Sequence, residues 1–180
     1  MNIQTIKLNT SIKQAIMADD MPWFIGDGKT TDYYNGDDNT EDFPQLTHLV
    51  YDKGEEKSKL AGQIMRDLQS ELDIEEFIRI KLNLLLRSNQ TPGKWHTPHV
   101  DWDLPHKVCV LYVNQSDGDT VLFNEQYERG VDKTEFSVQH KIIPEEDKAL
   151  LFDGKQYHAS CSPIKNNKRV VLNVDYKDSR

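Results

Sequence analysis

The sequence is poor in cysteine and has no long apolar stretch. Only two of its 180 residues are cysteine, Cys109 and Cys161, and they form no paired CxxC arrangement. Isolated cysteines of this kind are typical of buried thiols in a reducing cytoplasm. No apolar run is long enough to cross a bilayer, and residues 1–14 lack the apolar region of a signal peptide. We therefore expect a cytoplasmic protein without a membrane segment.

Positive charge is also scarce. The chain has 22 lysine and arginine residues against 30 aspartate and glutamate residues, a formal net charge of -8. Such an acidic surface repels phosphate backbones, so nucleic acid is a disfavoured partner unless a local basic patch overrides the balance. The length is typical of one domain with one core. We expect a single domain over residues 1–180, and no pattern indicates its oligomeric state.

The chain changes character near residue 75. Residues 1–76 are rich in turn and helix signals and are expected to give helical and loop support, with an acidic polar loop at 27–42. Between residues 54 and 72, apolar residues recur at helical spacing and form one stripe. The stripe consists of Leu60, Ala61, Ile64, Met65, Leu68 and Leu72. These residues predict a helix that covers a sheet formed by the second half.

The second half consists of short β-rich runs separated by turn clusters. The predicted strands are residues 77–86, 94–101, 107–114, 120–124, 136–142, 149–152, 156–160 and 168–176. Eight such strands suit a double-sheet jelly roll. The expected fold is therefore mainly β with flanking helices (α+β), with its jelly-roll core in residues 77–176.

Polar side chains occupy one face of two predicted strands. Successive side chains point to opposite sides of a sheet, so Arg79, Lys81 and Asn83 share a face, while apolar residues take the other. Asn173 and Asp175 lie on the polar face of the last strand. Such a face is either exposed to solvent or lines a barrel that holds a charged ligand. The metal-ligand pattern described next favours the barrel interior.

Three residues have the identity and spacing of a metal site. The segment TPHVDWD places His99 and Asp101 two residues apart on a predicted strand, so both side chains emerge on one face. His158 comes from the later run QYHAS. Two histidines and one carboxylate leave coordination positions open, as in Fe(II) oxygenases that bind O2 and a cosubstrate.

Arg169 adds a group suited to a dicarboxylate. It lies eleven residues after His158, which leaves room for a turn and a return along the adjacent antiparallel strand. A guanidinium there can bind the distal carboxylate of a dicarboxylate through two parallel hydrogen bonds, while the other end chelates iron.

With these pieces, the second half resembles the 2-oxoglutarate and Fe(II)-dependent dioxygenase superfamily, and within it the prolyl 4-hydroxylase-like branch. The matching pieces are HVD at 99–101, VLYVNQSDGDTVLF at 110–123, His158, and RVVLNV from Arg169. Members commonly have a Tyr-Leu-Asn strand followed by a turn with two glycines. Here Asp117 replaces the first glycine, which predicts an unusual backbone angle that aspartate tolerates.

The resemblance implies a cupin-like double-stranded β-helix that uses Fe(II), 2-oxoglutarate and O2, with ascorbate as an additional cofactor. It implies hydroxylation of a C-H bond in a prolyl, peptidyl or small-molecule substrate, with succinate and CO2 as coproducts. The implied metal ligands and catalytic residues are His99, Asp101 and His158. Arg169 would anchor the cosubstrate, Tyr112 would add a hydroxyl hydrogen bond to it, and Asn83 would lie near it.

Four residues beside the HVD motif are predicted to line the substrate entrance: Trp95, His96, Trp102 and Asp103. Two other functions stay open at this point. A non-catalytic, metal-binding cupin-like module would use the same ligands without a need for Arg169. A nucleobase demethylase of the same superfamily would need a basic groove, against the acidic balance of the chain.

Overall fold

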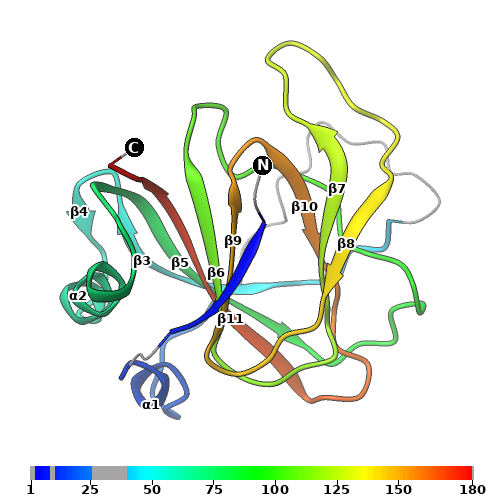
Figure 1. The fold of residues 1–180 in the computed structure, drawn as a ribbon. Helices are drawn as coiled ribbons and strands as arrows, with labels where there is room; N and C mark the ends of the chain where they lie inside the picture. The colour runs from blue at the N-terminus through cyan, green and yellow to red at the C-terminus, as the bar shows by residue number, and fades with distance from the viewer. Residues whose placement is uncertain (1–2, 9–10, 26–39, 180) are drawn as a thin grey trace.

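The structure, a computed structural model, describes residues 3–8, 11–25 and 40–179 (Figure 1). Most of the loop predicted at 27–42 lies outside these residues. The elements are β1 (Gln4–Lys7), α1 (Lys13–Ile16), β2 (Phe24–Ile25), β3 (Leu46–Asp52), β4 (Glu55–Glu56), α2 (Ala61–Glu71), β5 (Glu76–Leu86), β6 (Lys107–Tyr112), β7 (Thr120–Gln126), β8 (Val138–Ile142), β9 (Lys148–Asp153), β10 (Gln156–Ser160) and β11 (Lys168–Lys177).

The described strands form two antiparallel sheets. The larger sheet has the order β1-β9-β6-β11-β5-β3-β2, with β4 paired to β3, and the smaller has the order β10-β7-β8. From β6 onward the chain crosses repeatedly between the sheets, from β6 to β7, from β8 to β9, from β9 to β10 and from β10 to β11 (Figure 1). This alternation is the jelly-roll arrangement, so the predicted fold class is confirmed.

Seven of the eight predicted strands are present, and the segment at 94–101 is the exception. It runs beside β10 and is joined to it by isolated backbone hydrogen bonds instead of a regular ladder. His96 N donates to Ser160 O at 2.8 Å, and the backbones of His99 and His158 exchange two hydrogen bonds of 2.9 and 3.0 Å. Pro98, which has no N-H to donate, interrupts this pairing. The segment thus takes the place of a fourth strand beside β10 without regular strand structure.

The first 76 residues contribute more strand than predicted. Besides two helices they supply β1 to β4, and β3 pairs with β5 along the larger sheet. The prediction of helical and loop support missed these strands. In β3 the buried residues are His48 and Val50, whereas Leu49 is exposed. A buried histidine beside an exposed leucine hides the alternation by which a strand is recognised.

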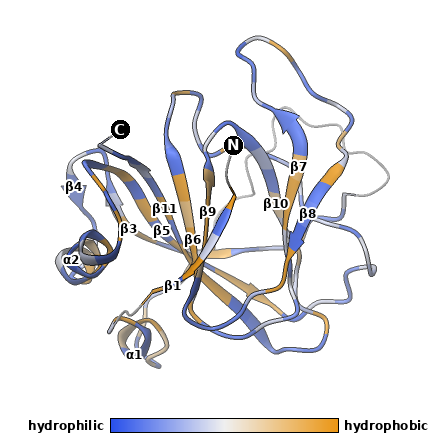
Figure 2. Cartoon of the chain, in the orientation of Figure 1, coloured by the Kyte–Doolittle hydropathy of each residue, from blue (hydrophilic) through white to orange (hydrophobic). Residues whose placement is uncertain are grey.

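The predicted helix is present as α2, which begins at Ala61 because residues 55 and 56 pair with β3 instead. Ala61, Ile64 and Leu68 are fully buried and belong to the same hydrophobic cluster as Leu82 of β5. Hydrophobic residues are concentrated in the sheets, whereas the connecting loops are largely hydrophilic (Figure 2). Among the described residues, no helix has the length and apolar character needed to span a membrane.

Both cysteines are free thiols. Cys109 lies in β6 within the core, where burial raises its pKa to about 12. Cys161 is half-buried and follows β10 directly.

Candidate metal centre and cavity

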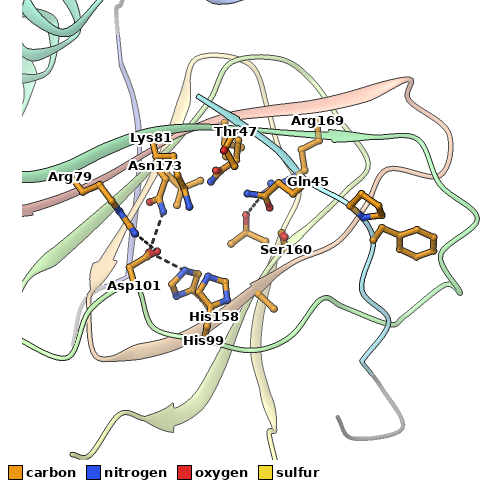
Figure 3. A pocket seen from close by; sticks show the side chains of 17 residues that line it. Gln45, Thr47, Arg79, Lys81, His99, Asp101, His158, Ser160, Arg169 and Asn173 are labelled. Atoms are coloured by element: carbon orange, nitrogen blue, oxygen red, sulfur yellow. Dashed lines mark hydrogen bonds and ion pairs between the residues drawn. The ribbon is translucent and has the colours of Figure 1, made fainter. Parts of the chain in front are cut away.

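Three side chains from two distant parts of the sequence converge between the two sheets. Ligand atoms of His99, Asp101 and His158 all lie within 4.8 Å of one another. His158 extends from β10, while the other two come from the irregular segment that runs beside it. The backbone bridge between His99 and His158 places their rings 4.5 Å apart, centroid to centroid. The predicted triad is therefore brought together, and Figure 3 shows its side chains facing one another.

The orientation of both imidazoles is set by backbone carbonyls. His99 Nδ1 lies 3.0 Å from Thr97 O, and His158 Nδ1 lies 3.2 Å from Gln156 O. A carbonyl oxygen only accepts, so each Nδ1 carries a proton and each Nε2 is the ring nitrogen left to face the other ligands. Burial, followed by the charge of His158, lowers the pKa of His99 to about 4. This histidine is thus neutral at pH 7, the state in which it can bind a metal.

Asp101 is held by partners on the larger sheet. Arg79 Nη2 donates to its Oδ1 at 2.6 Å, and Asn173 Nδ2 donates to its Oδ2 at 3.1 Å. Burial opposes ionisation of Asp101, but the hydrogen bond and charge of His158 and the charge of Arg79 outweigh it. They hold the pKa of Asp101 well below its usual range. The carboxylate is therefore ionised and fixed in orientation (Figure 3).

Arg79 also binds a second carboxylate, which no sequence pattern predicted. Its Nε donates to Asp175 Oδ2 at 2.9 Å, so one guanidinium bridges Asp101 and Asp175. Burial, followed by the nearby charge of Asp101, raises the pKa of Asp175 to about 7. Behind it, His106 Nε2 lies 3.9 Å from Asp175 Oδ1. The support of the metal ligand thus extends into the core through Arg79.

The triad opens onto a cavity of about 190 Å³ between the sheets. Its wall includes the polar faces of β5 and β11, as the alternation of these strands predicted. The lining residues that matter here are Thr47, Arg79, Lys81, Asn83, Thr120, Arg169 and Asn173. Asn83 Oδ1 and Asn173 Oδ1 are buried without a hydrogen-bond partner among the described residues. Buried polar atoms normally have a hydrogen-bond partner, so unpartnered ones on a cavity wall indicate a site that can bind a polar ligand.

Arg169 lies in the wall of this cavity and is 3 % exposed. Its Nε donates to Gly118 O and its Nη2 to Thr120 Oγ1, both at 2.8 Å. Burial lowers its pKa below the usual value, but an arginine remains cationic. Among the described residues, no carboxylate lies within ion-pair distance of its guanidinium. The cavity wall thus contains a buried, oriented cation that forms no ion pair with a described carboxylate.

Tyr112 supports this cation from behind. It is fully buried in β6, and its hydroxyl donates to Thr120 Oγ1 at 2.9 Å. The same Thr120 oxygen accepts from Arg169, and the guanidinium carbon lies 6.0 Å from the Tyr112 ring centroid. Tyr112 is not part of the cavity wall. The hydroxyl that was predicted to bind a cosubstrate donates to Thr120 in this structure, and the cosubstrate hydrogen bond stays a prediction.

Gly118, in the β6–β7 turn, lies very close to the backbone that follows β10 and to the side chain of Arg169. A Cβ there would lie 2.5 Å from Cys161 O, 2.9 Å from Pro163 N and 3.0 Å from Arg169 Cδ. Two of these atoms are backbone and cannot move aside. Gly118 therefore lets the β6–β7 turn pack directly on the arginine.

We expect Gly118→Ala to lower the free energy of unfolding by about 1–3 kcal/mol, the usual cost of overpacking. Urea denaturation measures this difference. Gly62→Ala in α2 is the matched control, because an added Cβ there meets only Arg66 Nη1 at 3.4 Å. That change should stabilise the protein slightly, since alanine favours helices. Equal effects of the two substitutions would contradict the packing role of Gly118.

The backbone angle predicted for Asp117 is not observed. The residues with positive φ other than glycine are Lys53 and Asp147 among those described, so Asp117 needs no unusual backbone angle. Its carboxylate instead accepts backbone hydrogen bonds from Ile164, Lys165 and Asn166 at 3.2, 2.8 and 2.9 Å. It thereby ties the β6–β7 turn to the turn before β11, which leads to Arg169.

These three bonds make stability depend on pH. Although partial burial opposes ionisation, they lower the pKa of Asp117. A carboxyl whose folded pKa is lowered stabilises above its unfolded pKa of about 3.9 and loses this contribution as pH falls through the folded value. We expect Asp117→Ala to cost about 1–2 kcal/mol at pH 7. The difference from wild type should shrink below about pH 4 in urea melts, and a difference independent of pH would refute the role.

Of the four residues predicted at the substrate entrance, only Trp102 lines a cavity. Trp102 lines a second cavity beside the first. Trp95 is instead buried against Phe123, and His96 is buried with its Nε2 2.8 Å from Ser162 Oγ. Asp103 is exposed and is part of neither cavity wall. The aromatic pair before the HVD motif is therefore structural, because the segment at 94–97 packs on the smaller sheet.

Comparisons with known proteins agree with this architecture. No protein-family model matches the chain, and no curated protein sequence matches it. A 2OG-Fe(II) oxygenase family oxidoreductase from Burkholderia pseudomallei is similar in structure, with a TM-score of 0.52, 12 % identity, and coverage of 77 % of this chain and 70 % of that one. The non-heme alpha ketoglutarate dependent epimerase SnoN of nogalamycin biosynthesis is also similar, with a TM-score of 0.57 and 8 % identity. The match covers 93 % of this chain and 71 % of that one.

A prolyl-4-hydroxylase from Pseudomonas putida also matches, at 18 % identity over 74 % of this chain and 69 % of its own, with a TM-score of 0.43. That score is too low to decide the branch. At these identities the likeness establishes a common fold, so the fold that the sequence resemblance implied is confirmed. What this chain does must be argued from its own side chains.

Proposed function

We propose that this protein is an Fe(II)- and 2-oxoglutarate-dependent dioxygenase that hydroxylates a C-H bond. The observation that carries the proposal is the placement of two features in one cavity. The triad of His99, Asp101 and His158 opens onto a cavity with the unpaired Arg169 in its wall. A metal site alone needs no buried cation. A chelating dicarboxylate needs both.

The residues present fit the metal and the cosubstrate. Two imidazoles whose Nδ1 atoms are held by backbone carbonyls, so that Nε2 is the atom left for a metal, and one ionised carboxylate are the facial set typical of non-haem Fe(II) enzymes. Each of these side chains is held in orientation by a hydrogen bond with Thr97 O, Gln156 O or Arg79. Hydrogen bonds of this kind to ligand side chains raise metal affinity. Zn, Cu or Ni would bind the same ligands more tightly than Fe(II), so the metal found after purification need not be iron.

Each residue has a defined task in this proposal. His99, Asp101 and His158 would hold Fe(II), and Arg169 would bind the distal carboxylate of 2-oxoglutarate through its fork of N-H groups. When bound, Fe(II) supplies the oxidising chemistry, in which O2 and 2-oxoglutarate yield succinate, CO2 and the hydroxylated substrate. Thr120 keeps the guanidinium in place, and the surrounding sheets exclude water. Asn83 contributes a polar atom to the same wall.

The substrate and setting are further parts of the proposal. A prolyl or peptidyl group and a small molecule both fit the reaction class, and ascorbate would serve as an additional reductant. The free thiols of Cys109 and Cys161 suit a reducing cytoplasm. A cupin-like module without catalysis would leave the buried charge of Arg169 unexplained, and no observation favours nucleobase demethylation.

Isothermal titration of 2-oxoglutarate into anaerobic Fe(II)-loaded protein tests the proposal. We expect saturable binding, a charge-transfer absorption band on mixing, and succinate release when air is admitted. Titration into metal-free protein is the control, since chelation should contribute much of the affinity. Absence of binding, absorption and succinate in a folded, metal-loaded sample would reject the oxygenase function.

A further inference from the structure

A second cavity of about 480 Å³ lies beside the first. The two share Thr47, Arg79, Lys81 and Asp101. The second cavity extends away from the metal ligands toward Trp102, and it includes neither Arg169 nor a ligand histidine. A cosubstrate held between Arg169 and the triad would therefore leave this space free for another molecule.

The strand register explains why Lys81 and Arg169 lie in different parts of the space between the sheets. Lys81 of β5 is paired with Asn173 of β11, four residues beyond Arg169. Four residues of an extended strand span about 13 Å, so the backbone of Lys81 lies well away from that of Arg169. Lys81 is instead level with Asn173, which contacts Asp101. In Figure 3, Lys81 lies beside Asn173 and Arg79, and Arg169 lies at the opposite side of the view.

Lys81 is a cation that forms no ion pair within the part of the chain that the structure describes. Among the described residues, no carboxylate lies within 4.0 Å of its ammonium group and no hydrogen bond to it is formed. The neighbouring Asp101 and Asp175 are both bound to Arg79. A partly buried lysine that faces a cavity and lacks a counter-ion has a high cost unless an anion binds it.

The charges around the second cavity are equal in number. Its wall has the cations Arg79, Lys81 and Lys53 and the carboxylates Asp52, Asp101 and Asp175, and Arg79 forms ion pairs with both Asp101 and Asp175. The ammonium of Lys53 lies 5.3 Å from the centroid of the Trp102 ring, so the same wall offers an aromatic surface. A ligand with one carboxylate and an apolar part would therefore meet Lys81, which forms no ion pair with the described residues, and an aromatic face.

We propose that the second cavity binds the substrate, and that the substrate is a small carboxylic acid whose carboxylate pairs with Lys81. Trp102 would contact its apolar part. This inference rests on the proposed function, because it assigns the first cavity to 2-oxoglutarate. Lys81 then determines specificity for an acid over its neutral analogues, since a neutral ligand would leave the ammonium unpaired. A phosphate dianion would need more positive charge than this wall provides.

The test compares acids with their amides on protein loaded with Mn(II) and saturated with 2-oxoglutarate. The probes are the straight-chain acids from acetate to hexanoate, benzoate and the free amino acids, each beside its primary amide. We expect at least one acid to raise the melting temperature and quench tryptophan fluorescence, while its amide does neither. In Lys81→Met the dissociation constant for that acid should rise roughly 30-fold or more. Because Lys81 borders both cavities, the affinity of this variant for 2-oxoglutarate should also fall, but by much less than its affinity for the acid.

Two further variants keep the result interpretable. Lys81→Arg retains the charge and should retain acid binding, which separates a specificity role from a folding defect. Lys59→Met replaces an exposed lysine outside both cavities and should change nothing. The inference is overturned if no acid binds, if the amides bind equally, or if Lys81→Met weakens 2-oxoglutarate instead. Failure of 2-oxoglutarate to bind wild type would reject the proposed function, whereas the acid response would still report on the second cavity.

Discussion

Replacing His158 by alanine is expected to abolish metal binding while the protein remains folded. The side chain supplies one of three ligands and orients Asp101, whose Oδ2 lies 3.4 Å from its Nε2. Loss of partners that only support metal ligands costs about 10–100-fold in affinity, so loss of a ligand should cost more than about 100-fold. Titration with Mn(II) or anaerobic Fe(II) measures the change. 2-Oxoglutarate binding and succinate release should disappear with the metal.

The control for this variant is His140→Ala, because His140 is exposed on β8 and belongs neither to the triad nor to the cavity walls. It should leave metal affinity unchanged. His158 is 6 % exposed and its ring centroid lies 5.0 Å from that of Phe152, so alanine would also leave a small void. His158→Gln keeps more of the volume and should lose the metal as well. Metal affinity within a few fold of wild type in both variants would refute the assigned ligand set.

The second large effect is expected at Arg169. We expect Arg169→Met to weaken 2-oxoglutarate binding by about 100-fold or more, because truncation of a buried charge pair costs 2–5 kcal/mol. Metal affinity should change little, since the guanidinium contacts Gly118 and Thr120 and no metal ligand. Titration of 2-oxoglutarate and Mn(II) into the same preparations separates the two effects.

Arg169→Lys refines this prediction. It keeps the charge but loses the fork that binds a carboxylate through two parallel bonds, so an intermediate affinity is expected. Arg129→Met, at an exposed arginine, is the control for loss of one positive charge. Unchanged affinity for 2-oxoglutarate in a folded Arg169→Met protein would favour the non-catalytic, cupin-like alternative.

The two substitutions together give a pattern that neither gives alone. Removal of His158 should eliminate both metal and cosubstrate binding, whereas removal of Arg169 should eliminate cosubstrate binding only. That asymmetry follows from chelation, in which one end of the dicarboxylate depends on the metal and the other on the arginine. Equal loss of both ligands in Arg169→Met would instead indicate a general collapse of the cavity.

The sequence by itself determined the strands of the jelly roll and the main residues of the site. Alternation on 77–86 and 168–176 placed Arg79, Lys81, Asn83 and Asn173 on one face, and the structure puts all four in the cavity wall. The motif HVD and the spacing to His158 and Arg169 identified the three side chains that converge and the arginine in the same cavity wall. These signals are local, because side-chain direction in a strand repeats every two residues whatever the strand pairs with.

Only the tertiary structure decided which of these residues touch. The register of β5 against β11 pairs Arg79 with Asp175 and Lys81 with Asn173, and no spacing within either strand contains that information. The same holds for Thr120, which joins Tyr112 to Arg169. Whether a lysine is paired depends on every element packed around it. The support of the metal ligands and the unpaired Lys81 are therefore products of long-range packing.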